Sequence, residues 1–351
     1  MSEPVMGWVV CRPRAARRVA LLATALSLLA GAVLSTPVLA ASDTSAAAVF
    51  AIQSPKAAKG LMIDVVHAGK RLVAVGDRGH ILYSDDQGNT WTQAKVPTRQ
   101  LLTAVFFVDD KQGWAVGHDA QILASSDGGA TWTQQYQDLK REAPLLDVWF
   151  NDARHGLAVG AYGALIETTD GGTTWADVSD RLDNEDQFHL NAIARIKDAG
   201  LFIVGEQGSM FRSSDDGQTW EKLEGPYEGS LFGVISTAQP QTLLAYGLRG
   251  NLYRSTDFGS TWEQVELNAT RGALEFGLSG ATLLDDGAIV VVGNGGSVVV
   301  SHDDGQTFSV FNRPDRISLS AVTAAGNGNL ILVGQGGVRV ATPAGAELVK
   351  Q

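Results

Sequence analysis

Cysteine is almost missing from this chain: its 351 residues include only one, Cys11. A single thiol forms no intramolecular disulfide and offers no thiolate set for a metal ion. Basic residues are scarce too, with 27 Lys and Arg against 38 Asp and Glu and a formal net charge of −11. Because nucleic-acid binding needs clustered cations, this balance argues against a nucleic-acid partner.

The main apolar run lies near the N-terminus, at residues 19–33, behind four arginines. Small residues follow it at Val38-Leu39-Ala40. This order is typical of a secretory signal peptide, so we expect residues 1–40 to be removed and the rest to be exported to the periplasm, or to a lumen in a photosynthetic host. A retained membrane anchor is the alternative, and Arg17-Arg18 leaves the export route open between the general and the twin-arginine pathways.

One short motif, Ser/Thr-x-Asp-x-Gly-x-Thr-aromatic, occurs six times after this segment. Its acidic and aromatic positions are Asp86 and Trp91, Asp127 and Trp132, Asp170 and Trp175, Asp215 and Trp220, Asp257 and Trp262, and Asp303 and Phe308. Successive Asp residues are 41 to 46 residues apart, close to the roughly 40 to 50 residues of a four-stranded propeller blade. We therefore expect one motif per blade.

The motif has a structural explanation. A short carboxylate followed by glycine closes a tight turn, because the carboxylate accepts backbone N–H groups and glycine adopts a left-handed conformation. The aromatic residue then starts the fourth strand and packs between neighbouring blades.

Each repeat reads as an apolar strand, a strand ending in Val-Gly, a third strand, the motif turn and a fourth strand. A seventh, degraded repeat has strands near residues 319–323, 330–334 and 338–342, but Pro343-Ala344-Gly345 replaces its motif turn. Its fourth strand comes either from residues 347–350 or, by ring closure, from residues 49–53. The predicted fold is all-β: one seven-bladed propeller of four-stranded antiparallel blades over residues 60–351, preceded by an N-terminal segment at 41–59 that is a candidate for closing the last blade.

Alternating strand direction places the motif turns and the Val-Gly turns on opposite faces. The Val-Gly turns keep their shape while the residue at the tip changes, which suits recognition, since binding tends to reside on loops. The partner-binding candidates on these turns are Arg78, His118, Asp119, Tyr162, Gln207 and Arg249. Longer blade-to-blade crossings at residues 136–144, 178–188 and 268–276 enlarge the same surface.

The blade written Gly113-Trp-Ala-Val-Gly117, then Ile122-Leu123, then the motif from Ser125 to Trp132 resembles the photosystem II stability and assembly factor family. The resemblance extends from about Gly60 to Thr342. It implies an exported seven-bladed propeller that acts without catalysis as an assembly factor for a membrane complex, with basic residues in docking; Arg78 and Arg249 are the basic tips here. The family does not by itself make the host photosynthetic.

A carbohydrate-active propeller is the alternative function, because sialidases and some glucanases share the motif turn. Sialidase chemistry resembles a tyrosine nucleophile with an arginine triad, for which only Tyr162 and Arg195 are isolated candidates here. The most suggestive acidic cluster, Asp183, Glu185, Asp186 and His189, lies in a polar crossing loop typical of solvated surface. The six histidines show no short ligand spacing for zinc, and the glycine-rich turns precede no helix that would cradle a phosphate.

Together these observations predict a monomeric, protein-binding propeller whose partner is a membrane-complex component. They predict no catalytic residues, metal site, nucleic-acid partner or small-molecule cofactor.

Overall fold

The computed structural model describes residues 49–269 and 272–348. The predicted signal peptide lies outside these residues. Within them, no helix is both long enough and apolar enough to cross a membrane.

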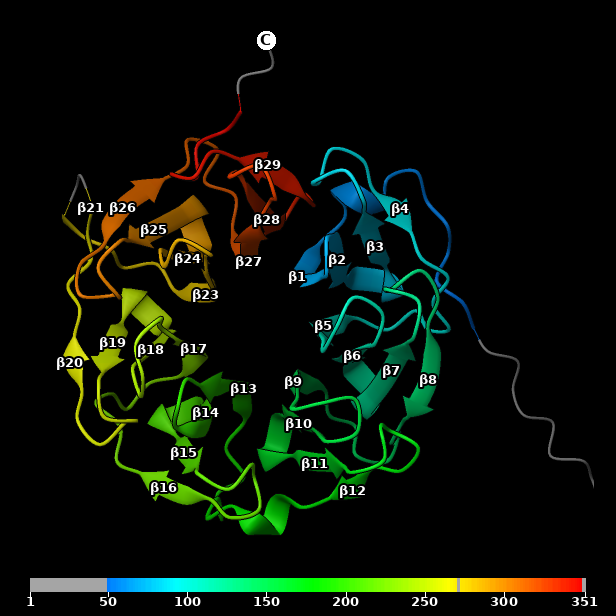
Figure 1. Ribbon diagram of the computed structural model, residues 1–351, viewed down its shortest axis with the longest axis horizontal. Coiled ribbons are helices and arrows are strands. Elements are labelled where there is room, and N and C mark those ends of the chain that lie inside the picture. Colours follow the sequence, from blue (N-terminus) through cyan, green and yellow to red (C-terminus); the bar gives the residue numbers. More distant parts are fainter. Residues whose placement is uncertain (1–48, 270–271, 349–351) are drawn as a thin grey trace, which may run out of the picture. The chain divides into compact units, whose positions relative to one another are not determined.

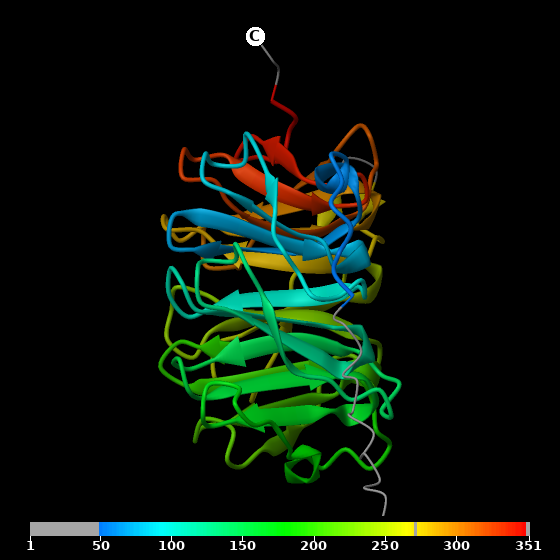
Figure 2. The ribbon, with the colours of Figure 1, turned by 90° about the vertical axis from the view of Figure 1, so that its right-hand side faces the viewer.

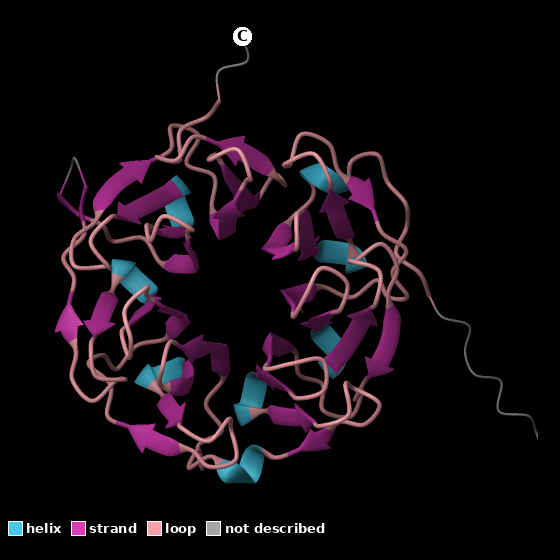
Figure 3. Cartoon of the chain, viewed as in Figure 1, coloured by secondary structure: helices cyan, strands magenta, loops and turns pink. Residues whose placement is uncertain are grey.

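Seven antiparallel sheets surround a central axis, as Figure 1 and Figure 3 show. Six of these sheets have four strands and the one nearest the C-terminus has three, each with its strands in sequence order. In Figure 2 the ring is seen edge-on, with the strands running between its two faces. The predicted seven-bladed propeller is confirmed.

The strand bounds follow the predicted repeat. Blade one contains β1 (Met62–Ala68), β2 (Arg71–Gly76), β3 (Ile81–Ser84) and β4 (Thr92–Gln93). Blade two contains β5 (Leu102–Phe107), β6 (Gly113–Gly117), β7 (Gln121–Ser125) and β8 (Thr133–Tyr136). Blade three contains β9 (Leu145–Phe150), β10 (Gly156–Gly160), β11 (Leu165–Thr168) and β12 (Ala176–Asp177). Blade four contains β13 (Leu190–Ile196), β14 (Gly200–Gly205), β15 (Met210–Ser213) and β16 (Glu221–Leu223).

The last three blades repeat this order. Blade five contains β17 (Leu231–Ser236), β18 (Leu243–Gly247), β19 (Leu252–Ser255) and β20 (Glu263–Gln264). Blade six contains β23 (Leu278–Leu283), β24 (Ile289–Gly293), β25 (Ser297–Ser301) and β26 (Ser309–Asn312). Blade seven contains β27 (Leu319–Ala324), β28 (Leu330–Gly334) and β29 (Arg339–Ala341). A small hairpin, β21 (Asn268–Ala269) with β22 (Gly272–Ala273), precedes blade six.

Short 3-10 turns supply the helical content of the described residues. Two of them lie outside the strand-to-strand turns, at η1 (Ala57–Lys59) and η5 (Ser179–Arg181). The others follow the second strands of blades one to six, at η2 (Asp77–Gly79), η3 (His118–Ala120), η4 (Ala161–Gly163), η6 (Glu206–Gly208), η7 (Leu248–Gly250) and η8 (Asn294–Gly296).

The core lies in the seams between blades. The second strands are buried almost throughout, as the run Leu330 to Gly334 of β28 illustrates, because a strand inside a blade is covered on both faces by its neighbours. Buried apolar residues form seven clusters, and each draws on two adjacent blades. Packing between blades, rather than one central core, therefore holds the ring together.

The motif turns form one face of the ring, which we call the Asp-box face, and the blade-two copy shows their geometry. The Asp127 carboxylate accepts the N–H and the hydroxyl of Thr131 at 2.9 and 2.6 Å. Ser125 Oγ donates to Asp127 Oδ1 at 2.9 Å and accepts the N–H of Gly129 at 2.9 Å. The Trp132 indole N–H donates to the carbonyl of Gly129 at 2.9 Å. The turn thereby satisfies its own polar groups and fixes the position of the Trp132 indole ring.

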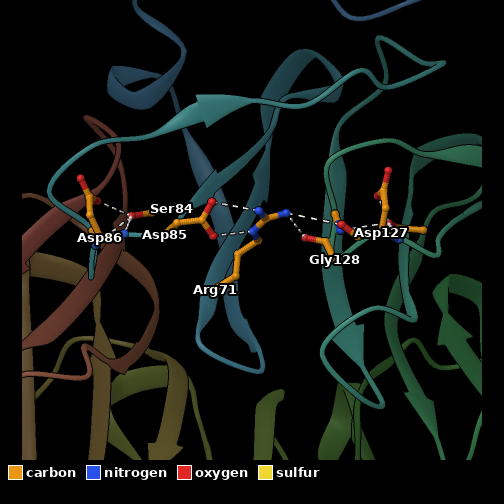
Figure 4. Close-up of polar contacts among 9 residues, drawn as sticks. Arg71, Ser84, Asp85, Asp86, Asp127 and Gly128 are labelled. Carbon is orange, nitrogen blue, oxygen red and sulfur yellow. Dashed lines mark hydrogen bonds and ion pairs between the residues drawn. The ribbon is translucent and has the colours of Figure 1, made fainter.

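A side chain of the preceding blade clasps each motif turn of blades two to six. In Figure 4, Arg71 of β2 forms an ion pair with Asp85 at 2.7 Å and donates to the Gly128 carbonyl of the next blade at 3.1 Å. The other four clasps reach backbone carbonyls in the same way: Gln135 to Gly171, Arg181 to Gly217, Arg212 to Phe258 and Arg254 to Asp304. The Asp-box face is thus tied together from blade to blade.

The fourth strands begin one residue later than expected, after the aromatic residue. In blade two, β8 starts at Thr133, because the N–H of Trp132 donates to the Lys95 carbonyl of blade one at 3.2 Å. The backbone N–H of the aromatic residue thus bonds to the preceding blade and not to its own sheet.

The two segments considered for the end of blade seven lie in different places. Glu347 forms an antiparallel bridge with Ala341 at the end of β29. Ala51, from the N-terminal segment, donates its N–H to the Val96 carbonyl of blade one at 2.9 Å. Residues 49–53 therefore run along the outside of blade one, because their backbone groups find partners there.

The ring closes through the inner strands of blades seven and one. Each inner strand carries a bulge at the same place, one residue after its start, where an extra residue stays out of the ladder. In blade seven this residue is Ser320, whose hydroxyl donates to the Met62 carbonyl of β1 at 2.8 Å. Farther along β1, His67 Nε2 contacts the Ala324 carbonyl at 2.9 Å.

Replacing Trp132 by Ala is expected to lower the free energy of unfolding by about 3 to 5 kcal/mol, because the ring is buried in the seam of blades one and two. It lies edge-on to Phe107 at 5.9 Å between ring centroids. Chemical denaturation measures the change. Trp91→Ala is the matched control and should cost less, since its ring is only partly buried; an unchanged midpoint for Trp132→Ala would contradict the seam role.

Candidate functional site

The face opposite the Asp boxes carries the turns that were predicted to bind a partner, and we call it the tip face. In each of blades one to six, the middle residue of the turn adopts a left-handed conformation, with φ between 53° and 63°. These tip residues are Arg78, Asp119, Tyr162, Gln207, Arg249 and Gly295. The turns are thus one repeated structure with interchangeable tips, as the sequence predicted.

The left-handed conformation makes the choice of tip residue informative. It costs a non-glycine residue about 1 kcal/mol or more, whereas glycine adopts it freely. Blade six places Gly295 there, but blades one to five keep a large side chain. Non-glycine residues adopt the same conformation in motif turns of the Asp-box face, at Gln87, Asp216, Phe258 and Asp304. The variety of the side chains at equivalent tips, and not the strain alone, therefore makes the tip face a candidate binding surface.

The candidate residues differ in how free they are. The side chains of Arg78, Gln207 and Arg249 are exposed, as is His118, which lies one residue before its tip. Asp119 accepts a hydrogen bond from the Gln100 side chain at 2.6 Å. The four exposed candidates are therefore available to a partner as they stand, whereas Asp119 would first have to give up its hydrogen bond from Gln100.

Tyr162 belongs to a small cluster that the sequence pattern did not reveal. Its ring is 58 % exposed and lies edge-on to His189 at 5.1 Å between centroids. His189 in turn is 3.8 Å from Glu206 of the next blade. The cluster joins the tip turns of blades three and four into one aromatic and polar surface.

A second surface that sequence reasoning missed surrounds Arg249. Leu248 is 39 % exposed beside it, and Phe276, from the crossing into blade six, is 43 % exposed. The Phe276 ring lies against Gly295, where even a methyl group would be 3.1 Å from the ring. A large tip in blade six would collide with this ring, which explains the glycine; an exposed Phe next to a tip turn was the available sequence signal.

The two basic tips do not form one patch. Arg78 is on blade one and Arg249 on blade five, so other blades separate them in both directions around the ring (Figure 1). A partner would have to span the face to reach both.

The acidic crossing loop gathers no metal-binding set. Asp183 lies 3.8 Å from Lys222, and His189 faces Glu206 rather than the loop carboxylates. Among the described residues, no group of three or more His, Cys, Asp or Glu side chains is placed to hold a metal ion.

The residues considered for sialidase chemistry lie on opposite faces. Tyr162 is at a tip, whereas Arg195, near the end of β13, pairs with Asp216 of the blade-four motif turn. The structure does not bring them together.

Three titratable groups that the sequence reading overlooked surround the axis. Asp64 and Asp147 follow the inner-strand bulges of blades one and three, and each accepts the N–H of a residue on the next blade, Val105 or Ile193, at 2.9 Å. Burial raises the pKa of Asp64 to about 6. Burial, with a smaller contribution from Asp64, raises the pKa of Asp147 to about 7.

Tyr246 completes the group at the same level of the ring. Its hydroxyl occupies the space above Gly233 of β17, 2.2 Å from where a methyl group would be. Burial, and then the charges of Asp147 and Asp64, raise the pKa of Tyr246. Raised carboxyl pKa values occur at many active sites, but both carboxylates join adjacent blades, so a structural role explains them. A charged residue interrupting an apolar inner strand was the sequence signal.

Stability is expected to fall by on the order of 6 kcal/mol as pH rises from about 4 to 7, because Asp64 and Asp147 both hold protons more tightly in the folded state. Their contribution is present below the unfolded pKa near 4 and is lost as pH passes about 6 and 7. Denaturation at several pH values measures it. Asp64→Asn with Asp147→Asn should flatten the profile; an unchanged slope in this variant would assign the dependence to other groups.

Arg249→Gly is expected to unfold with a free energy about 1 kcal/mol higher than Arg249→Ala, because both remove the side chain but only glycine relieves the left-handed backbone. Urea denaturation of the two variants, side by side, measures the difference. Equal stability would mean that the tip turns carry no strain.

A family model described as the photosynthesis system II assembly factor YCF48 matches residues 83–145 and 134–337. A search of curated proteins finds no match. The family model spans most of the propeller, including the motif turns and tip turns of blades two to six.

Solved structures support the fold. A structure titled "YCF48 bound to D1 peptide" is similar at 20 % identity and a TM-score of 0.64, covering 83 % of this chain and 94 % of that one. YCF48 from Cyanidioschyzon merolae is similar at 18 % identity and a TM-score of 0.62, covering 82 % and 96 %. A streptogramin B lyase, at 13 % identity and a TM-score of 0.67, covers 80 % and 93 %.

At these identities the structural likeness establishes the propeller alone, and a propeller serves binding proteins and enzymes equally well. The family model is more specific, because it matches the sequence over most of the chain. The resemblance found in the blade motifs is thereby confirmed: this chain belongs to the family of the photosynthesis system II assembly factor YCF48.

Proposed function

We propose that this chain is an exported, non-catalytic assembly or stability factor that binds a subunit of a membrane protein complex through its tip face. The observation that carries the proposal is the set of five different side chains that equivalent tip turns present on one face, in a chain whose family is described as an assembly factor. A solved family structure with a bound D1 peptide supports a peptide segment as the form of the partner.

Export completes the proposal. The basic and apolar pattern of residues 1–40 supports a cleaved signal and a periplasmic location, or a lumenal one in a photosynthetic host. Mass spectrometry of the protein isolated from its host should find Ala41 as the first residue; a chain that keeps residues 1–40 would refute the signal.

The two surfaces of the tip face differ in chemistry, which guides the search for a partner. The surface of Tyr162 and His189 offers aromatic edges with a nearby carboxylate, Glu206. The surface of Arg249 offers an exposed guanidinium that forms no ion pair within the described part of the chain, together with the exposed side chains of Leu248 and Phe276. A segment with an acidic or carboxylate-terminal residue next to an apolar one fits the second surface best.

Crosslinked affinity capture in the native host tests the proposal. The protein should selectively retain an integral membrane protein, and Arg249→Glu or Arg78→Glu should each reduce recovery several-fold because charge reversal on the tip face repels an acidic segment. The two variants are tested separately, since the arginines lie on separate blades.

Arg154→Glu is the matched control, because Arg154 is an exposed arginine in the first hairpin turn of blade three, on the Asp-box face. Its recovery should equal that of the unaltered protein. Equal recovery for all three variants would remove the two arginines from the interface, and absence of any membrane protein would overturn the proposed function.

A further inference from the structure

One of the seven seams lacks a motif aromatic. Six of the core clusters contain a ring contributed by the following blade's motif turn: Trp91, Trp132, Trp175, Trp220, Trp262 and Phe308. The cluster between blades six and seven is built from aliphatic residues such as Val298, Val300 and Leu332. It has no such ring among the described residues, because Pro343-Ala344-Gly345 replaces the motif turn in blade seven.

A large groove of about 1160 Å³ lies at this seam on the Asp-box face. Its apolar lining includes Leu284, Val298, Val300, Phe311 and Pro343. It extends from blade six past blade seven to the first hairpin of blade one, where Lys70 lines it. This volume exceeds that of a typical small-molecule pocket and has room for a turn with an aromatic side chain.

The short turn of blade seven is fixed in place beside the groove. Arg313 is buried, and its guanidinium donates to the Gly345 carbonyl at 2.8 Å and pairs with Asp315 at 3.1 Å. Gly345 lies against Val298: a methyl group added to Gly345 would be 2.7 Å from the Val298 side chain. The turn therefore cannot move inward to fill the missing ring's place.

The charges at the groove have an acidic excess. Asp85 is paired with Arg71 at 2.7 Å. The remaining lining residues among Lys, Arg, Asp and Glu are one cation, Lys70, and two anions, Asp285 and Asp286. Asp285 and Asp286 are exposed, and neither forms an ion pair within the described part of the chain. This end of the groove attracts a cationic side chain.

We propose that the groove between blades six and seven binds a segment of a partner protein, which inserts an aromatic side chain where the other seams hold a motif ring and places a Lys or Arg against Asp285 and Asp286. The inference rests on the proposed protein-binding function and adds a second site on the opposite face. The six seams that hold a motif ring indicate that this space accepts an aromatic side chain. The acidic excess indicates that the neighbouring residue of the partner segment is cationic.

The chain's own blade-four motif provides the probe. A synthetic peptide with the sequence of residues 212–222 carries the motif Trp two positions before a Lys. Fluorescence anisotropy of the labelled peptide with the purified protein should show saturable binding. A peptide with Ala in place of the Trp, and one with Glu in place of that Lys, should each bind at least tenfold more weakly.

Filling the groove with a side chain of the protein should weaken peptide binding as much as removing the Trp from the peptide does. Ala344 is exposed and lines the groove, so Ala344→Trp should keep the fold and weaken peptide binding at least tenfold. Ser309→Trp, from the exposed start of β26 on the same lining, is the second variant if the first unfolds. Ala153→Trp is the matched control, at an exposed site in the first hairpin turn of blade three, and should bind normally.

The outcomes separate this site from the proposed function. No binding of the peptide, equal binding of its Trp-to-Ala form, or normal binding by the groove variants would overturn the groove proposal. If Arg249→Glu loses the membrane partner while Ala344→Trp captures it fully, the tip-face function stands and the groove has no part in it. If both lose the partner, the two faces act together.

Discussion

The whole ring depends on one small interaction, the carboxylate that closes each motif turn. An Asp carboxylate that accepts the N–H of a Thr with one oxygen and the hydroxyl of the same Thr with the other leaves the turn little freedom. The turn then presents a backbone carbonyl to the preceding blade and a ring to the seam. Because the clasp by Arg71 and the burial of Trp132 both start from this turn, local hydrogen bonding is converted into contact between blades.

This arrangement divides the work between the two faces. On the Asp-box face, polar groups are mostly used within the protein, by carboxylates, hydroxyls and clasping side chains such as Arg212 and Arg254. The tip face instead presents a different side chain from each of its equivalent turns in blades one to five. The surface proposed for the partner is therefore the face whose side chains are least used within the ring, and the groove at the seam of blade seven is the exception on the other face.

The sequence was sufficient for the blades and the tip turns, because both depend on local patterns that repeat every 40 or so residues. It failed where the partner of a residue lies on another blade. Nothing near Ala51 indicates that its N–H meets Val96, and nothing near Asp64 indicates that it bonds to Val105. Separation of Arg78 from Arg249 likewise follows from counting blades around a closed ring, not from either turn.

Blade seven shows what a ring can omit. Its inner strand closes the circle through Ser320 and the Met62 carbonyl, so the closure does not need an outer strand or a motif turn from this blade. The seam with blade six keeps its aliphatic residues, which explains why the ring tolerates the loss of one aromatic residue. Because each of the other six seams has its own motif ring, the missing turn affects packing only locally and leaves a groove on the Asp-box face.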